Sequence, residues 1–155
     1  MKLNIGCGKK EYHLQGYINV DIKPVEGAVY GDILDLKYSD NYFEEIICND
    51  VLEHVTDPPL AVSEMYRVLK PGGYVDGNIP YLHPIHSKQD YWRFTKQGIE
   101  ELFKDYSKVY VTRTTGFFGV LAVFTGRLKP IFNWLDRRYK LGNNATQSYG
   151  VMAIK

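Results

Sequence analysis

Small and acidic residues stand where the first three apolar runs of the sequence end. Gly6 and Gly8 follow the first run, Asp21 closes the second, and Asp32 closes the third. Glycine lets a ligand approach the backbone closely, and its N–H group can bind a carboxylate. A carboxylate side chain only accepts hydrogen bonds, which suits it to both hydroxyls of a ribose or to an adenine amino group. These four residues predict a site for a nucleoside-like ligand.

A fourth apolar run ends at Asn49 and Asp50, close to where the reactive group of such a ligand would lie. In open parallel sheets, ligands bind beyond the carboxyl ends of the strands, at the crevice where the strand order reverses. We therefore expect the ends of the four runs to converge on one crevice.

The segment 81–95 is the second place where the residue types indicate chemistry. It carries two histidines that can titrate near neutral pH, a carboxylate, an arginine and several large aromatic rings. It follows the fifth apolar run and so emerges at the same sheet edge as the crevice. We predict His86 as a general base or as the group that orients a second substrate, with His83 as the next candidate. Asp90 or Asp50 would orient the imidazole or that substrate.

Two other interpretations of this segment stay open. Asp90 and Arg93 could simply pair and tie the loop to the helix expected after Thr95, with Trp92 in the core. His83, His86 and Asp90 are also metal-ligand types at short spacing. Because neither a cysteine nor a helical frame supports that spacing, we expect no metal.

The pattern of apolar runs predicts the elements that hold these residues. Short apolar runs alternate with helical patterns, which is typical of a parallel sheet covered by helices. One helix should begin at Asp57, and Pro71 with the glycines beside it should stop that helix. Only residues 9–16 separate the first two strands, which is too short for an ordinary crossover helix. The strands are expected at 3–5, 17–20, 28–30, 45–48, 74–79, 109–112 and 150–154, and the apolar stripe of the helix at Ala61, Met65, Val68 and Leu69.

Five motifs in this order resemble the class I S-adenosylmethionine-dependent methyltransferases, in particular their broad small-molecule branch. The match runs from about residue 3 to residue 103, and only the ordered set of motifs is specific. The segment from Asp90 to Thr95, with histidines before it, is similar to a recurrent element of the same branch. The motifs are Leu3-Asn4-Ile5-Gly6-Cys7-Gly8, Gly16-Tyr17-Ile18-Asn19-Val20-Asp21, Gly31-Asp32-Ile33-Leu34, Asn49-Asp50-Val51-Leu52-Glu53-His54-Val55 and Arg67-Val68-Leu69-Lys70-Pro71-Gly72-Gly73.

The resemblance implies an α/β fold, a Rossmann-like three-layer sandwich. Its mostly parallel seven-stranded sheet has an antiparallel last strand, and here the first helix is shortened. The resemblance also implies S-adenosylmethionine as cofactor, whose sulfonium the rings of Tyr81 and Trp92 could shelter. The implied cofactor contacts are Gly6, Gly8, Asp21, Asp32 and Ile33, to which we add Asn4, Cys7, Lys10, Ile22 and Asn49 from the same strand ends.

Two positions depart from the family pattern. The family usually has an acidic residue where Asn4 stands and a third glycine where Lys10 stands. Lys10 adds bulk and charge beside the methionine end of the cofactor. We hypothesise that Lys10 helps to hold the methionine carboxylate.

Composition limits the alternatives. With 155 residues we expect a single methyltransferase domain over 1–155, and a formal charge of +1 provides no global field to attract nucleic acid. Two cysteines make no disulfide framework, and the N-terminus leads straight into a strand without a signal peptide, so we expect a cytoplasmic protein. A nicotinamide fingerprint would need a third glycine where Glu11 stands.

Residues 116–141 are expected to form a helical insertion between the last two strands. Their apolar run is too short to span a bilayer, and basic residues surround it. We favour packing against the sheet edge or a homodimer contact over contact of 116–140 with a membrane surface.

The function predicted from the sequence is methyl transfer to oxygen or nitrogen of a small-molecule, sugar or lipid-like acceptor. The alternative is a non-catalytic subunit or regulator that binds the cofactor without turnover. A nucleic-acid methyltransferase is disfavoured by the charge, and Asn-Pro-Pro-Tyr or a similar tetrapeptide is absent after the fourth strand.

Overall fold

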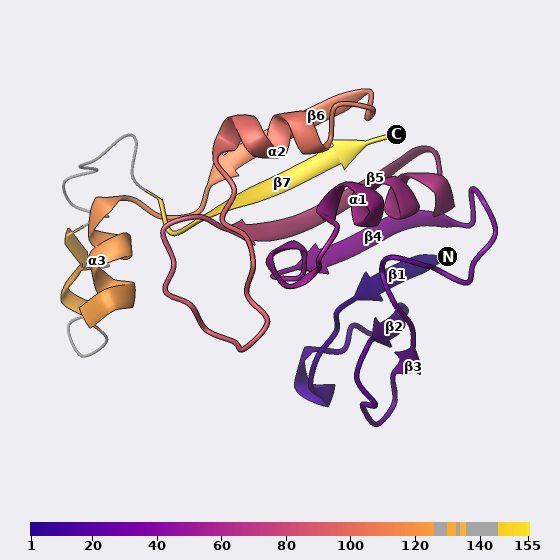
Figure 1. The fold of residues 1–155 in the computed structure, drawn as a ribbon, viewed down its shortest axis with the longest axis horizontal. Helices are drawn as coiled ribbons and strands as arrows, with labels where there is room; N and C mark the ends of the chain where they lie inside the picture. The colour runs from indigo at the N-terminus through magenta and orange to yellow at the C-terminus, as the bar shows by residue number, and fades with distance from the viewer. Residues whose placement is uncertain (126–129, 133, 136–145) are drawn as a thin grey trace.

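A seven-stranded sheet in the order β3-β2-β1-β4-β5-β7-β6 organises the described part of the chain (Figure 1). This computed structural model describes residues 1–125, 130–132, 134–135 and 146–155. β7 is antiparallel to both of its neighbours, and the other pairings are parallel. The strands are β1 (Lys2–Ile5), β2 (Ile18–Asp21), β3 (Val29–Tyr30), β4 (Phe43–Asn49), β5 (Leu69–Pro80), β6 (Lys108–Arg113) and β7 (Ser148–Ile154).

This topology confirms the predicted fold class. The strand order reverses between β1 and β4, which places a crevice beyond their carboxyl ends. The shortened first helix is a 3-10 turn, η1 (Lys10–Tyr12). The few residues available between β1 and β2 leave no room for more.

Two helices form one layer over the sheet (Figure 1). α1 (Pro58–Val68) is capped by Asp57, whose side chain accepts a hydrogen bond from the Leu60 N–H. α2 (Lys96–Leu102) is capped in the same way by Thr95. Leu69, which the sequence pattern assigned to the first helix, instead begins β5. Pro71 cannot continue a helix, so the chain becomes extended just before it.

The core lies between this layer and the central strands. Leu3 and Ile5 of β1 point into it, while Asn4, the residue between them, faces the other side of the sheet. There Asn4 donates a hydrogen bond to the Tyr12 carbonyl oxygen at 3.3 Å. η1 therefore covers part of the face that a full first helix would have covered.

α3 (Phe117–Thr125) follows β6 in the predicted insertion. Positions 126–129, 133 and 136–141 of that insertion lie outside the described residues, so the insertion, its dimer or membrane contact and the single-domain organisation stay predictions. Across the described ranges, no helix is both long and apolar enough to cross a membrane.

Candidate functional site

A cavity of about 430 Å³ lies at the carboxyl ends of β1, β2 and β4. Both carboxylates predicted to hold a nucleoside, Asp21 and Asp32, are part of its wall. Its volume falls within the range of about 300–1,000 Å³ that is typical of small-molecule sites. Five of the predicted cofactor residues line it, Gly6, Asp21, Ile22, Asp32 and Ile33, together with the predicted catalytic residue Asp50.

A second hollow of about 630 Å³ adjoins the first and shares Gly6 and Asp50 with it. The remaining predicted cofactor residues, except Lys10, line this second hollow: Asn4, Cys7, Gly8 and Asn49. Lys10 lies on the surface outside both hollows, where its Nζ pairs with Glu26 Oε1 at 2.8 Å. The predicted contact of Lys10 with the methionine carboxylate therefore requires that pair to open.

The glycine turn after β1 has the backbone that the sequence predicted. Gly6 and Gly8 have φ angles of 66° and 59°, in the left-handed region that favours glycine. A Cβ atom on Gly6 would lie 2.3 Å from the Cγ2 atom of Val51, so the turn packs tightly against the end of β4.

Asp21 is held in place by two backbone groups. Its Oδ2 accepts a hydrogen bond from the Gly8 N–H at 2.8 Å, and its Oδ1 accepts one from the Lys23 N–H at 2.9 Å. A carboxylate offers about four lone-pair positions, so both oxygens keep acceptor capacity toward the cavity. Asp32 is fixed by one such bond, from the Leu34 N–H to Oδ1 at 2.9 Å.

Asp50 has a strained backbone where β4 ends. Its φ angle is 52°, which is uncommon for a residue other than glycine. Asn78 of β5 holds it on both sides: the Asn78 side chain donates to Asp50 Oδ1, and the Asp50 N–H donates to the Asn78 carbonyl oxygen. The carboxylate therefore has a fixed position at the rim that the two hollows share.

The segment 81–95 folds back onto the 3-10 turn η2 (Leu52–His54) that follows β4. The Tyr91 N–H donates to the Glu53 carbonyl oxygen at 2.8 Å, and the Trp92 indole N–H donates to that of Val55 at 2.9 Å. These bonds bring His86 beside His54, with 3.1 Å between their Nε2 atoms. The His83 ring lies 5.0 Å from the His86 ring, between centroids.

Asp90 contacts both Arg93 and His86, so it fits the structural and the catalytic interpretation of this segment. It forms an ion pair with Arg93, as the structural interpretation predicts, and that guanidinium holds the pKa of Asp90 well below its usual range. Asp90 also lies 3.2 Å from His86 Nδ1 and accepts a hydrogen bond from the His86 N–H. The same carboxylate therefore ties the loop and orients the imidazole.

The aromatic residues lie elsewhere than predicted. Trp92 is 43% exposed and so is not a core residue, and Tyr81 packs against Tyr149. Neither of them lines the cavity, whereas Tyr91 does. Of these three rings, only that of Tyr91 can therefore contact a ligand in the cavity.

The sequence alone named Glu53 and His54 only as members of a motif and gave neither of them a role in the chemistry. His54 lines the cavity, and its Nδ1 contacts the Gln89 carbonyl oxygen. Glu53 is fully buried, and burial raises its pKa to about 7. Adjacent acidic and imidazole groups directly after a strand were the available signal. Their partner His86 is 32 residues further along the chain, so local spacing could not reveal the cluster.

Comparison with known proteins gives one family and several relatives. Residues 3–75 match the family model described as a methyltransferase domain. The chain is 22% identical over 153 residues to a ubiquinone biosynthesis O-methyltransferase of Pseudomonas fluorescens, covering 93% of this chain and 62% of that enzyme. The chain thus spans less than two thirds of the curated relatives it matches.

Solved structures share the fold over nearly the whole chain. A SAM-dependent methyltransferase from Archaeoglobus fulgidus superposes with a TM-score of 0.68 at 17% identity, covering 99% of this chain and 85% of its own. A phosphoethanolamine N-methyltransferase 2 of Haemonchus contortus, in complex with S-adenosylhomocysteine, gives 0.66 at 16% identity, covering 99% of this chain and 48% of its own.

Proposed function

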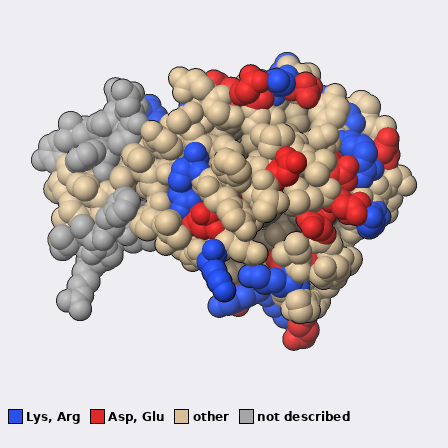
Figure 2. Space-filling model, in the orientation of Figure 1, with Lys and Arg blue, Asp and Glu red and all other residues tan. Residues whose placement is uncertain are grey.

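We propose an enzymatic function from two premises. Residues 3–75 match the methyltransferase-domain family, and the chain has the fold of the SAM-dependent methyltransferases. The proposed reaction moves a methyl group from S-adenosylmethionine to oxygen or nitrogen of a small-molecule, sugar or lipid-like acceptor. On the face shown in Figure 2, acidic and basic side chains are interspersed, which suits a small acceptor better than a polyanion.

One observation carries this proposal: Asp21 and Asp32 line the same cavity, next to a glycine turn in the left-handed backbone region. Asp21 is positioned to accept hydrogen bonds from the ribose hydroxyls, and Asp32 with Ile33 to contact the adenine. Gly6 and Gly8 carry no side chain, so the methionine end of the cofactor can approach the backbone of the turn closely. When bound, S-adenosylmethionine supplies an electrophilic methyl group on a sulfonium, together with a good leaving group.

The task of the protein is then mainly to align two reactants. Such alignment can contribute about 7–11 kcal/mol, whereas a general base contributes about 10²–10⁴-fold in rate. We assign the base to His86 and keep His83 as the next candidate. Asp90 orients the His86 ring, and Asp50 stands at the rim where the acceptor would meet the methyl group.

Calorimetry with S-adenosylmethionine tests the cofactor site. We expect Asp21→Asn and Asp32→Asn to bind the cofactor at least about 10-fold more weakly, because each weakens hydrogen bonds to a charged acceptor. Asp105→Asn is the matched control, since Asp105 is exposed and lies outside both hollows. If the folded wild-type chain does not bind the cofactor, the proposal is wrong.

An assay of released S-adenosylhomocysteine against pools of acceptors tests the reaction itself. Turnover that falls in His86→Ala while cofactor affinity stays unchanged supports the base assignment. Cofactor binding without turnover on any pool favours the alternative of a non-catalytic binding subunit.

A further inference from the structure

Glu53 is a buried acid without a hydrogen-bond partner among the described residues. Its side chain is fully buried, and neither Oε1 nor Oε2 has a hydrogen-bond partner among the described residues. An isolated buried carboxylate is costly, so buried charges are normally paired or bind a metal. The residue lies in η2, and its neighbour His54 lines the cofactor cavity. A cation bound to Glu53 would therefore lie close to the reactants.

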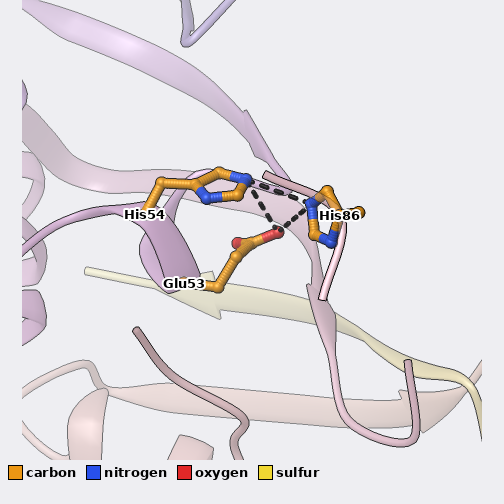
Figure 3. Close-up of side chains that lie close together, drawn as sticks. All are labelled: Glu53, His54 and His86. Carbon is orange, nitrogen blue, oxygen red and sulfur yellow. Dashed lines mark hydrogen bonds and ion pairs between the residues drawn. The ribbon is translucent and has the colours of Figure 1, made fainter. Parts of the chain in front are cut away.

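Two imidazoles face this carboxylate (Figure 3). Glu53 Oε1 lies 3.6 Å from His54 Nε2 and 3.7 Å from His86 Nε2, and the two Nε2 atoms are 3.1 Å apart. Nitrogen and oxygen ligands bind Zn²⁺ at about 2.0–2.2 Å, so tetrahedral ligand atoms are about 3.4 Å from one another. The three separations of 3.1, 3.6 and 3.7 Å are close to this value.

The outer ring nitrogens are already held by the protein. His54 Nδ1 contacts the Gln89 carbonyl oxygen, and His86 Nδ1 lies 3.2 Å from Asp90 Oδ2. Asp90 is in turn locked by Arg93. Metal-bound histidines nearly always donate their second ring nitrogen to a carboxylate or a carbonyl, which leaves the first nitrogen for the metal. Both Nε2 atoms are left facing Glu53 in this arrangement.

From this geometry we propose that Glu53, His54 and His86 bind a divalent transition-metal cation. Two imidazole nitrogens and one carboxylate oxygen suit zinc, iron or manganese better than magnesium or calcium, which prefer all-oxygen sites. The ligands differ from the set that the sequence suggested, because the fold brings η2 to His86 while His83 and Asp90 support it from outside.

The place of the cation suggests its use. His54 lines the cofactor cavity, so a cation held by these three residues would lie beside the region where the acceptor would enter. There the cation binds and orients an acceptor oxygen or nitrogen. This role rests on the proposed function and takes the place of the base assigned to His86, because a bound cation would occupy His86 Nε2 while Asp90 holds Nδ1. Binding of the cation does not depend on the proposed function.

Metal titration of the tag-free 155-residue chain tests the site. Chelator-treated protein is titrated with Zn²⁺ by calorimetry and with Co²⁺ by visible absorption, whose intensity reports the coordination geometry. We expect one equivalent to bind, and affinity at least about 10-fold weaker in Glu53→Gln and in His86→Ala. His13→Ala is the control, because His13 lies in the connection between β1 and β2 and should bind Zn²⁺ like the wild type.

Each outcome decides for or against the site. Absence of wild-type binding, or equal loss in His13→Ala and His86→Ala, overturns it and leaves a metal-free imidazole pair. Should Glu53→Gln not fold, as judged by circular dichroism, His86→Ala decides alone, since His86 is on a loop and 34% of its side chain is exposed. Calorimetry with S-adenosylmethionine on the same samples separates the two proposals: cation binding without cofactor binding supports the metal site and refutes the proposed function.

Discussion

Replacing Glu53 by Gln should stabilise the metal-free protein at neutral pH. The change keeps the shape of the side chain and removes its negative charge. Burial is the main reason that the pKa of Glu53 rises from 4.5 to about 7, and the nearby charge of Asp50 raises it further. As the pH rises through neutrality, the folded wild type therefore acquires a buried charge that has no hydrogen-bond partner, and the Gln variant does not.

The size of the effect follows from this shift of the pKa. Well below pH 4.5 the carboxyl is protonated in both the folded and the unfolded chain, so its burial does not lower the free energy of unfolding through ionisation. Between pH 4.5 and about 7 the unfolded chain loses this proton while the folded chain keeps it, so the stability of the wild type falls as the pH rises. At 1.36 kcal/mol per pKa unit the total loss is about 3 kcal/mol, or about 6–12 °C in Tm for a chain of this length.

Thermal and urea unfolding of both proteins from pH 5 to pH 8, with chelator present, measures this difference. The stability advantage of Glu53→Gln should be small at pH 5 and reach about 3 kcal/mol by pH 8. Glu45→Gln is the matched control. Glu45 is also buried, but it pairs with Lys2 and Tyr17, which lower its pKa, so this variant should lose stability at neutral pH. A Glu53→Gln variant no more stable than the wild type at pH 8 would refute the reasoning.

Three further substitutions test the frame around the site. In Gly77→Ala, the new Cβ would lie 2.1 Å from the Cys48 carbonyl oxygen of β4. We expect a loss of about 3 kcal/mol in urea unfolding, and an unchanged midpoint would contradict the close approach. Asp57→Ala should cost about 1 kcal/mol by the same measurement, while Asp57→Ser keeps the α1 cap and most of the stability. Arg93→Met should speed hydrogen exchange in residues 81–95 without affecting β4 and β5, because it frees Asp90 and three loop carbonyls. Unchanged exchange would show that the loop is held by other contacts.

The fold was predictable because its signals are local. Asp57 followed by Pro58 sets the start of α1, and Pro71 with the glycines beside it sets its end to within one residue. The eight residues between the first two strands predicted the missing helix, since a crossover has a minimum length. The antiparallel last strand, in contrast, was expected only because the resemblance implied the fold of the family.

The cofactor side was predictable for a related reason. Parallel strands bring their carboxyl ends to one edge, so Asp21 and Asp32 meet there whatever the loops between them do. Lys10 lies outside the cavity because the surface offers it a nearby partner in Glu26. A pairing between two exposed side chains from different loops leaves no pattern in the sequence.

The acceptor side depends instead on how one long loop returns to η2. The residue types in 81–95 indicated chemistry, but the return path is set by bonds from the loop backbone and Trp92 to the carbonyls of Glu53 and Val55. Every residue type has the same backbone carbonyl group, so the sequence does not reveal which carbonyls accept these hydrogen bonds from the loop. The sequence therefore drew attention to His86 but not to Glu53, which the fold brings beside it.

The 3-10 turn η2 links the two halves of the site. A 3-10 helix has three residues per turn, so neighbouring side chains point about 120° apart. Glu53 consequently faces the interior while His54 next to it faces the cofactor cavity. Because His54 belongs to both the proposed metal site and the cavity wall, a ligand that moves its ring changes the affinity of the other site. By linkage the effect is equal in both directions, so a change in cofactor affinity on adding Zn²⁺ must match the change in Zn²⁺ affinity on adding the cofactor.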